Sequence, residues 1–154
     1  MLTPLAPAHR ARLSELVGDT PEFAAPEKAV ALELADAALG GDEDYRFLVD
    51  VEGDALRGYI CWGKTSMTKA TYDLYWIAVS RAFRGHGVGR GLVRAMEEEL
   101  ARSRARLVRV ETESSPAYAA TRAFYDALGY ERLAVIRHFY DEDNDLVLYG
   151  KYLV

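Results

Sequence analysis

The sequence predicts an α+β fold, a mixed α/β arrangement in which a mostly antiparallel, twisted sheet is flanked by helices. Three observations indicate this class. Two segments with helical periodicity open the chain, hairpin-like pairs of strands follow, and one strand–helix–strand unit lies in the middle. A chain of 154 residues is long enough for one hydrophobic core. We therefore expect residues 1–154 to form a single domain, with no internal repeat and no linker.

The two N-terminal helices are predicted from apolar residues that recur every three or four positions, over segments 8–17 and 26–39. The buried face of the second helix is expected to carry Val30, Leu34 and Ala37 or Ala38. Strands rich in β-branched and aromatic residues are predicted over 45–51, 56–64, 72–79, 106–113, 133–140 and 146–154. A helix of about 15 residues is expected after the third strand and a shorter one within 115–130, since amphipathic spacing returns in both places.

Charge and composition exclude several classes of function. The net charge of −5 argues against non-specific nucleic-acid binding, which requires a basic surface. Cys61 is the single cysteine, so no internal disulfide can form, and a reducing compartment, the cytoplasm, is expected. The N-terminus lacks the basic and apolar regions of a secretory signal, and no apolar run is long enough to cross a membrane. We expect neither a membrane nor a nucleic acid as partner.

A glycine-rich stretch, RGHGVGRG, lies between the third predicted strand and the helix that follows it. Backbone N–H groups at a helix N-terminus attract anions, and the helix dipole adds partial positive charge. Glycine lets ligand oxygens approach the backbone closely, and Arg84 and Arg90 can add charge-assisted contacts. The stretch therefore predicts a phosphate or pyrophosphate site.

Two better-known phosphate loops do not fit. A nucleoside-triphosphate loop requires Gly-Lys followed by Ser or Thr, and the stretch contains no such ending. The dinucleotide pattern G-x-G-x-x-G requires glycine where Arg90 or Leu92 stands. That pattern also belongs to chains that open with a β-α-β unit, whereas this chain opens with helices. A nucleotide-binding module of the NAD type is disfavoured.

The pattern Arg84-x-x-Gly87-x-Gly89 after IAV resembles the pyrophosphate loop of the GNAT superfamily of acetyl-CoA-dependent N-acyltransferases. About 25 residues further on, a second motif resembles the family's next helix, with its A-x-x-F-Y-x-x-x-G-Y/F signature. Its matching residues are Ala120 or Ala123, Phe124, Tyr125, Gly129 and Tyr130. The tail resembles the family's closing hairpin, so the resemblance covers Tyr45 to the C-terminus. It implies a GNAT-like sheet with a β-α-β cofactor-binding core, acetyl-CoA as cosubstrate and no metal.

The resemblance also implies which residues bind the cofactor. In the family the strand before the loop bulges, and its backbone holds the pantetheine arm and the acetyl carbonyl; here that strand carries Ile77, Ala78 and Val79. The pyrophosphate would lie on the loop residues Arg84, Gly85, His86, Gly87, Val88, Gly89 and Arg90. Tyr118 stands where the family often has an asparagine that touches the pantetheine arm, which puts that one contact in doubt.

The resemblance and the chemistry together nominate catalytic residues. Tyr125 matches the family tyrosine that can protonate the departing thiolate. An acceptor ammonium must lose its proton before it attacks, and Glu111, Asp73, Glu113 or a water relay are the alternatives for that base. His86 lies in the loop and is not expected to be catalytic.

Other chemistry-bearing residues have structural interpretations. His138 is expected to be structural, and Cys61 a buried small hydrophobe. The acidic segment DEDND lacks the glycine and glutamate of a calcium loop, so it is interpreted as a hairpin turn. Some aromatic residues could line an acceptor pocket, although most of them suit the sheet core. These residues are Tyr45, Trp62, Tyr72, Tyr75 and Tyr140.

The predicted function is transfer of an acetyl group from acetyl-CoA directly to a primary amine of a small molecule, an amino acid, or a peptide or protein. The alternative is a non-catalytic acyl-CoA-binding or dimerisation module on the same fold. Dimers are common in this superfamily, so the resemblance also implies a homodimer.

Overall fold

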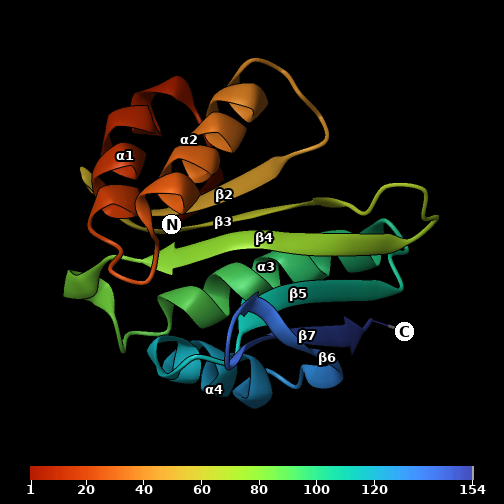
Figure 1. The fold of residues 1–154 in the computed structure, drawn as a ribbon. Helices are drawn as coiled ribbons and strands as arrows, with labels where there is room; N and C mark the ends of the chain where they lie inside the picture. Colours follow the sequence, from red (N-terminus) through yellow and green to blue (C-terminus); the bar gives the residue numbers. More distant parts are fainter. Residues whose placement is uncertain (154) are drawn as a thin grey trace.

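A seven-stranded sheet organises the computed structural model, which describes residues 1–153 (Figure 1). The strand order is β1-β2-β3-β4-β5-β7-β6. The strands are β1 (Leu2–Pro4), β2 (Arg46–Glu52), β3 (Ala55–Lys64), β4 (Thr71–Val79), β5 (Leu107–Glu113), β6 (Glu131–Asp141) and β7 (Asn144–Tyr152). Only the β4–β5 pair among these strands is parallel, and the chain crosses between them through a helix. The predicted α+β class is confirmed.

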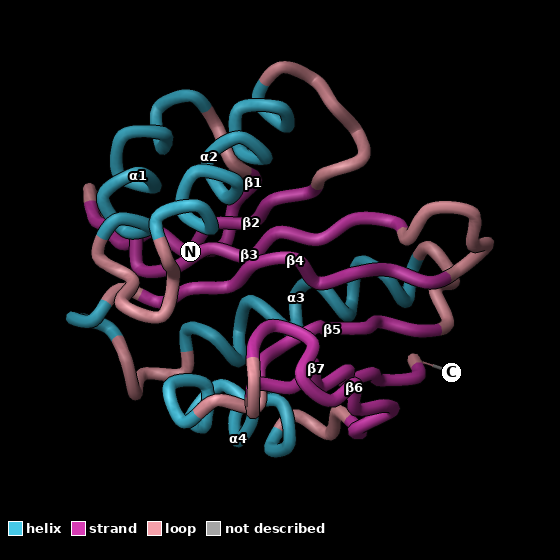
Figure 2. The backbone as a smooth tube through the Cα atoms, viewed as in Figure 1, coloured by secondary structure: helices cyan, strands magenta, loops and turns pink. Residues whose placement is uncertain are grey.

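Helices cover both faces of this sheet (Figure 2). The α-helices are α1 (Arg10–Gly18), α2 (Ala25–Leu39), α3 (Val88–Arg102) and α4 (Ala119–Ala127). Short 3-10 turns are η1 (Pro7–His9), η2 (Arg81–Phe83) and η3 (Pro116–Tyr118). Helices α1 and α2 pack on one face, and α3 and α4 on the other, so the middle strands are buried on both sides.

Alternation along β3 shows how the sheet separates two cores. Tyr59 and Cys61 belong to the cluster under α1 and α2, whereas Ile60 and Trp62 belong to the cluster under α3 and α4. Successive side chains of a strand point to opposite faces, which explains this division. Cys61 is fully buried, as predicted.

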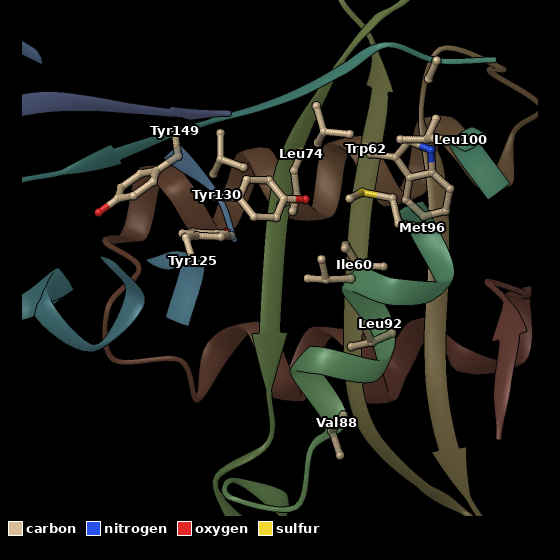
Figure 3. Packing of buried hydrophobic residues seen from close by; sticks show 14 of the residues in the cluster. Ile60, Trp62, Leu74, Val88, Leu92, Met96, Leu100, Tyr125, Tyr130 and Tyr149 are labelled. Carbon is tan, nitrogen blue, oxygen red and sulfur yellow. The ribbon is translucent and has the colours of Figure 1, made fainter. Parts of the chain in front are cut away.

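Helix α3 anchors the glycine loop to the second core. Its apolar residues Val88, Leu92, Met96 and Leu100 recur every four positions and are all buried. Figure 3 shows three of them, Leu92, Met96 and Leu100, on the side of the helix that faces the sheet, in one cluster with Ile60 and Trp62. The strongly amphipathic sequence therefore fixes the direction in which the N-terminus of α3 points.

Three predictions about elements need correction or limits. Strand β1 was not predicted; the Met1 amino group holds it by donating to Asp50 Oδ1 at 3.0 Å and to the Val51 carbonyl at 2.8 Å. The predicted buried face of α2 is wrong at Val30, which is 43% exposed. Leu34 and Ala38 pack against the core as predicted, although the most buried residues of that helix are Ala31 and Ala35. Small alanine side chains allow the helix to lie close to its neighbours. The predicted last strand extended to residue 154, which lies outside the described residues.

No helix in the described part of the chain is both long and apolar enough to cross a membrane.

Candidate active site

The parallel strands β4 and β5 pair over their first three residues and then part from each other. Their pairing covers Thr71 with Leu107, Tyr72 with Val108 and Asp73 with Arg109, and it stops there. On its other side, β4 has a bulge relative to β3, because Trp62 pairs with Leu74 while Cys61 pairs with Trp76. The bulged residue is therefore Tyr75. Bulges bend the strand that carries them, which accounts for the separation of β4 from β5 beyond Asp73.

A cleft of about 750 Å³ opens where the two strands part. Both strands line it, and residues of the α1–α2 loop and of α4 complete its walls. Among the predicted residues, it is lined by Asp73, Ile77, Ala78, Val79, Arg84, Gly89, Glu111, Glu113, Tyr118 and Tyr125. The structure thus gathers strand, loop and helix candidates around one space. The loop residues Gly85, His86, Gly87, Val88 and Arg90 do not line the cleft itself.

The β4 wall of the cleft presents backbone groups. The Ser80 N–H donates to the Arg57 carbonyl at 2.8 Å, and the β3–β4 register is regular from Ser80 back to Trp76. Hydrogen-bonded and non-bonded pairs alternate in antiparallel strands. Ala78 therefore directs its N–H and carbonyl to β3, whereas Ile77 and Val79 direct theirs into the cleft.

This alternation bears on one expectation. The resemblance implied that the backbone of Ile77, Ala78 and Val79 alike would face the cofactor; Ala78 lines the cleft, but its backbone groups are directed to β3. The carbonyl of Val79 accepts a hydrogen bond from Arg84 Nε at 3.3 Å. On β4, the backbone groups that face this space beyond the bulge without a strand partner are therefore both groups of Ile77 and the N–H of Val79.

The glycine loop forms an N-terminal anion site. Gly85 and Gly87 have φ of +80° and +79°, a conformation that costs other residues free energy, and Gly87 is the N-cap of α3. The first amide beyond the loop, that of Gly91, donates to the Gly87 carbonyl at 2.9 Å. None of the amides of residues 85–90 donates to an acceptor within residues 1–153. They remain available to an anion.

Gly89 is required for a different reason. A Cβ at this position would lie 3.1 Å from Cε1 of Phe124 and 3.5 Å from a methyl carbon of Val79. The absence of a side chain lets α3 approach β4 and α4 at the mouth of the cleft. The two sequence motifs, one around Gly89 and one around Phe124, therefore meet in space.

The arginines that flank the loop differ in their contacts. Besides its bond to Val79, Arg84 forms an ion pair with Glu22 at 3.6 Å, so its side chain is directed toward the α1–α2 loop. Arg90 is exposed. His86 is also exposed, with Nδ1 3.0 Å from the Arg84 carbonyl.

Tyr125 is almost fully buried, with 2% of its surface exposed, yet it lines the cleft. Its ring lies among those of Phe124, Tyr130 and Tyr149, with centroid distances of 5.4, 5.6 and 5.8 Å. Figure 3 shows three of these tyrosines grouped beside the sheet. Burial raises the pKa of the Tyr125 phenol well above its usual range, so the hydroxyl keeps its proton at neutral pH. The phenol therefore carries a proton that it can donate within the cleft.

The candidate bases lie together on the opposite side of the cleft. Asp73 accepts a hydrogen bond from Thr65 Oγ1 at 2.8 Å and forms an ion pair with Arg109. Glu111 is half exposed, with Oε1 3.8 Å from Arg109 Nη1. Glu113 accepts a hydrogen bond from the side-chain amide of Asn144. Asp73 is thus the most firmly held carboxylate, and Glu111, with its partner at 3.8 Å, is the least constrained of the three.

Tyr118 connects the two sides of the sheet across the cleft. Its hydroxyl donates to the Glu22 carbonyl at 2.8 Å and lies 3.4 Å from Glu27 Oε2. Burial, together with the Glu27 and Glu113 carboxylates, raises the pKa of Tyr118. The tyrosine side chain is larger than the asparagine that the family often has at this position, and it therefore reaches the α1–α2 loop. The sequence did not indicate this contact.

Several lining residues carried no signal in the sequence. Glu22, Phe23 and Glu27 come from the α1–α2 region, far away in the chain, and Thr112 lies within β5. Of the aromatic residues considered for an acceptor pocket, only Tyr75 and Tyr140 line the cleft, since Trp62 is buried in the core and Tyr45 packs on Tyr75 at 5.8 Å. Tyr72 packs against the core of the α3 and α4 face.

His138 lies outside the candidate chemistry of the cleft. His138 Nδ1 accepts a hydrogen bond from the Asp143 N–H at 3.0 Å, within the hairpin that ends β6. Across residues 1–153, no three His, Cys, Asp or Glu side chains are grouped so that they could hold a metal ion.

The fold and the cleft define a class of protein. Two parallel strands that separate, unpaired strand backbone on one wall and an amide-lined helix N-terminus at the mouth together suit an extended ligand with a phosphate group. The comparison with known families identifies that class. The chain belongs to the acetyltransferase (GNAT) family, whose model matches residues 10–130. The predicted family, and with it the acetyltransferase class, is confirmed.

Solved structures agree with this assignment. A GNAT-family protein from Desulfovibrio desulfuricans is 32% identical, with a TM-score of 0.96, covering 100% of this chain and 99% of its own. An aminoglycoside 6'-N-acetyltransferase complexed with coenzyme A is 17% identical, with a TM-score of 0.79 and coverage of 100% and 97%. The ribosomal-protein-S18-alanine N-acetyltransferase from Escherichia coli is 18% identical, with a TM-score of 0.78 and coverage of 99% and 93%. The last two show likeness of fold alone.

No curated protein matches the sequence.

Proposed function

We propose that this protein transfers the acetyl group of acetyl-CoA directly to a primary amine. The observation that carries the proposal is the continuity of the site. The unpaired amides of residues 85–90 lie at one end, the free backbone of Ile77 and Val79 lines the wall, and Tyr125 lies in the same cleft. A pyrophosphate, an extended amide-containing arm and a thioester fit these three parts in that order. The family membership and the coenzyme A complex of a protein with the same fold support the choice of ligand.

The chemistry assigns a role to each group. Glu111 takes a proton from the acceptor ammonium, either directly or through water, and the neutral nitrogen then attacks the thioester carbonyl carbon. The carbon–sulfur bond breaks, and Tyr125 gives its proton to the departing thiolate. The new amide nitrogen loses its second proton, and a proton returns to the Tyr125 phenolate, both through water. Backbone N–H groups of β4 stabilise the negative charge that develops on the carbonyl oxygen.

Direct transfer is favoured over a covalent acyl-enzyme. Cys61 is the single thiol of the chain, and it is fully buried and does not line the cleft. Burial also raises the pKa of this thiol, which keeps it in the poorly nucleophilic protonated form. The acceptor amine is therefore the nucleophile that meets the thioester.

The charge of the cleft favours a cationic acceptor. Its lining includes the carboxylates of Glu22, Glu27, Asp73, Glu111 and Glu113 but only two guanidinium groups, those of Arg84 and Arg109. Both arginines are already paired with carboxylates of the same lining. Tyr140, whose pKa is raised to about 12 by burial and by Glu111, Glu113 and Glu27, lies beside this excess of negative charge. An amine that carries a second positive charge suits this surface.

A thiol-release assay tests the proposal. The protein is incubated with acetyl-CoA and either diaminopentane or pentylamine, and free coenzyme A is measured. We expect release that depends on the amine, with a lower KM for the diamine. Binding of acetyl-CoA without amine-dependent release would support the non-catalytic acyl-CoA-binding module instead.

A matched pair of variants isolates the contribution of charge. Glu27→Gln removes a carboxylate that lines the cleft. Glu33→Gln is the control, because Glu33 lies outside the cleft lining. We expect only the former to raise the KM for the diamine, and an equal KM in both would contradict the cationic preference. The homodimer and the cytoplasmic location stay predictions.

A further inference from the structure

Thr112 is a buried polar residue without a hydrogen-bond partner. It is 5% exposed, and its Oγ1 has no partner within residues 1–153. The other buried threonine, Thr20, donates to the Leu16 carbonyl at 2.9 Å, and the buried Asp50 accepts from Arg57 at 2.9 Å. Buried polar groups are nearly always paired, so an unpaired hydroxyl calls for a partner that the protein does not supply.

The position of Thr112 shows where that partner would lie. The hydroxyls of Tyr59 and Tyr149 are also buried and unpaired, but neither residue lines the cleft, whereas Thr112 does. The Ser114 N–H donates to the Asp145 carbonyl at 2.9 Å. This bond shows which residues of β5 direct their backbone groups to β7, because every second residue of the strand does so. By alternation, the backbone groups of Thr112 bond to β7, and only its side chain is left to meet a ligand.

Thr112 stands at the level of Ile77 across the cleft. It is three residues beyond Arg109, where the β4–β5 pairing ends. The bulge adds one residue to β4, so the corresponding β4 position is four residues beyond Asp73, which is Ile77. Thr112 also points to the same face of β5 as Val110, the face covered by α4 and Tyr125.

We propose that the Thr112 hydroxyl donates a hydrogen bond to a carbonyl oxygen of the pantetheine arm of coenzyme A, from the wall opposite the Ile77 backbone. This inference rests on the proposed function, because it takes the cleft as the acetyl-CoA site. The arm carries amide carbonyls along its length, and a hydroxyl donor matches them. The two walls then hold the arm from both sides, β4 through its backbone and β5 through this one side chain.

Two substitutions separate the hydroxyl from the shape of the side chain. Thr112→Val keeps the branched shape and removes the hydroxyl, whereas Thr112→Ser keeps the hydroxyl. Calorimetric titration with coenzyme A and with acetyl-CoA should show an increase in Kd of about tenfold for the valine variant and less than about threefold for the serine variant. Without ligand, the valine variant should melt at or above the wild-type temperature, because it loses an unpaired buried polar group.

The outcomes discriminate between explanations. Wild-type affinity in the valine variant, or a lower melting temperature of that variant with unchanged affinity, would overturn the assignment in favour of a structural role. A loss confined to acetyl-CoA would place the contact on the thioester carbonyl and overturn the assignment to the arm. If the wild-type protein fails to bind coenzyme A, the proposed function fails, and the assignment fails with it. Binding by wild type and valine variant alike overturns the Thr112 assignment alone.

Discussion

At the scale of single residues, the proposed chemistry depends on the surroundings of Tyr125. The phenol is enclosed by three other aromatic rings, and its side chain lines the cleft. We predict that Tyr125→Phe lowers kcat by about 100-fold, the scale of losing a general acid, while the Kd for coenzyme A changes little. Steady-state kinetics and calorimetry check this pair of results. A parallel loss of affinity would assign the residue to cofactor positioning.

The protonation of the same residue gives a prediction for pH. Because burial raises the pKa of Tyr125, the acid form persists through the range in which the acceptor amine becomes neutral. We predict that kcat/KM rises with pH and shows no descending limb up to about pH 10, the ordinary tyrosine pKa. A pH–rate profile that falls between about pH 8 and 9 would point to a different acid.

At the scale of elements, the junction of the glycine loop with α3 separates conformational from steric demands. Gly87 has φ of +79°, whereas Gly91 lies inside the helix, where an added Cβ would meet no heavy atom within 4 Å. We predict that Gly87→Ala destabilises the protein by about 1 kcal/mol and weakens coenzyme A binding, because the N-terminal amides shift. Gly91→Ala should instead add about 0.5–1 kcal/mol with unchanged affinity. Urea unfolding and calorimetry measure both, and changes in stability of the same sign would contradict this account.

At the scale of the whole molecule, Tyr118 joins layers that the sheet separates. Its hydroxyl bonds the start of α4, on one face, to the Glu22 carbonyl in the loop between the helices of the other face. We predict that Tyr118→Phe lowers the free energy of unfolding by about 1 kcal/mol and raises the KM for acetyl-CoA, because the loop is released from the cleft. Thermal unfolding and kinetics check this. Unchanged values of both would show that the bond does not hold the loop in solution.

Stability at alkaline pH is also a property of the whole molecule. Burial raises the pKa of Tyr59, Tyr125 and Tyr130 in the folded state. The folded protein therefore retains protons that the unfolded chain loses above about pH 10, so the stability present below that pH is lost as the pH rises further. We predict a melting temperature that is lower at about pH 11 than at about pH 8. An unchanged melting temperature would show that these phenols are not buried in solution.

Local patterns in the sequence determined the elements and the family. The period of the apolar residues is a property of neighbouring positions, so it located the strands, the helices and the amphipathic face of α3. Glycines with positive φ and a helix start are also local features, so the anion loop could be predicted from residues 84–91 alone. The three-residue strand β1 was not predicted because its pattern is too short. The prediction for the face of α2 was wrong at Val30, because close packing there favours the smaller Ala31.

Tertiary structure decided how the cleft is completed. The bulge at Tyr75 separates β4 from β5. The alternation of hydrogen bonds between β3 and β4 directs the backbone groups of Ile77, rather than those of Ala78, into the space between β4 and β5. Tyr118 meets Glu22 across 96 positions of sequence, and the hydroxyl of Thr112 is left unpaired only because its surroundings are buried. Such contacts depend on the register and the packing of segments far apart in the chain. Local composition carries no information about that geometry. This is the physical reason why the sequence predicts the family, its loop and lining residues on β4, β5 and α4, but neither the bulge that opens the cleft nor the wall that the α1–α2 region supplies.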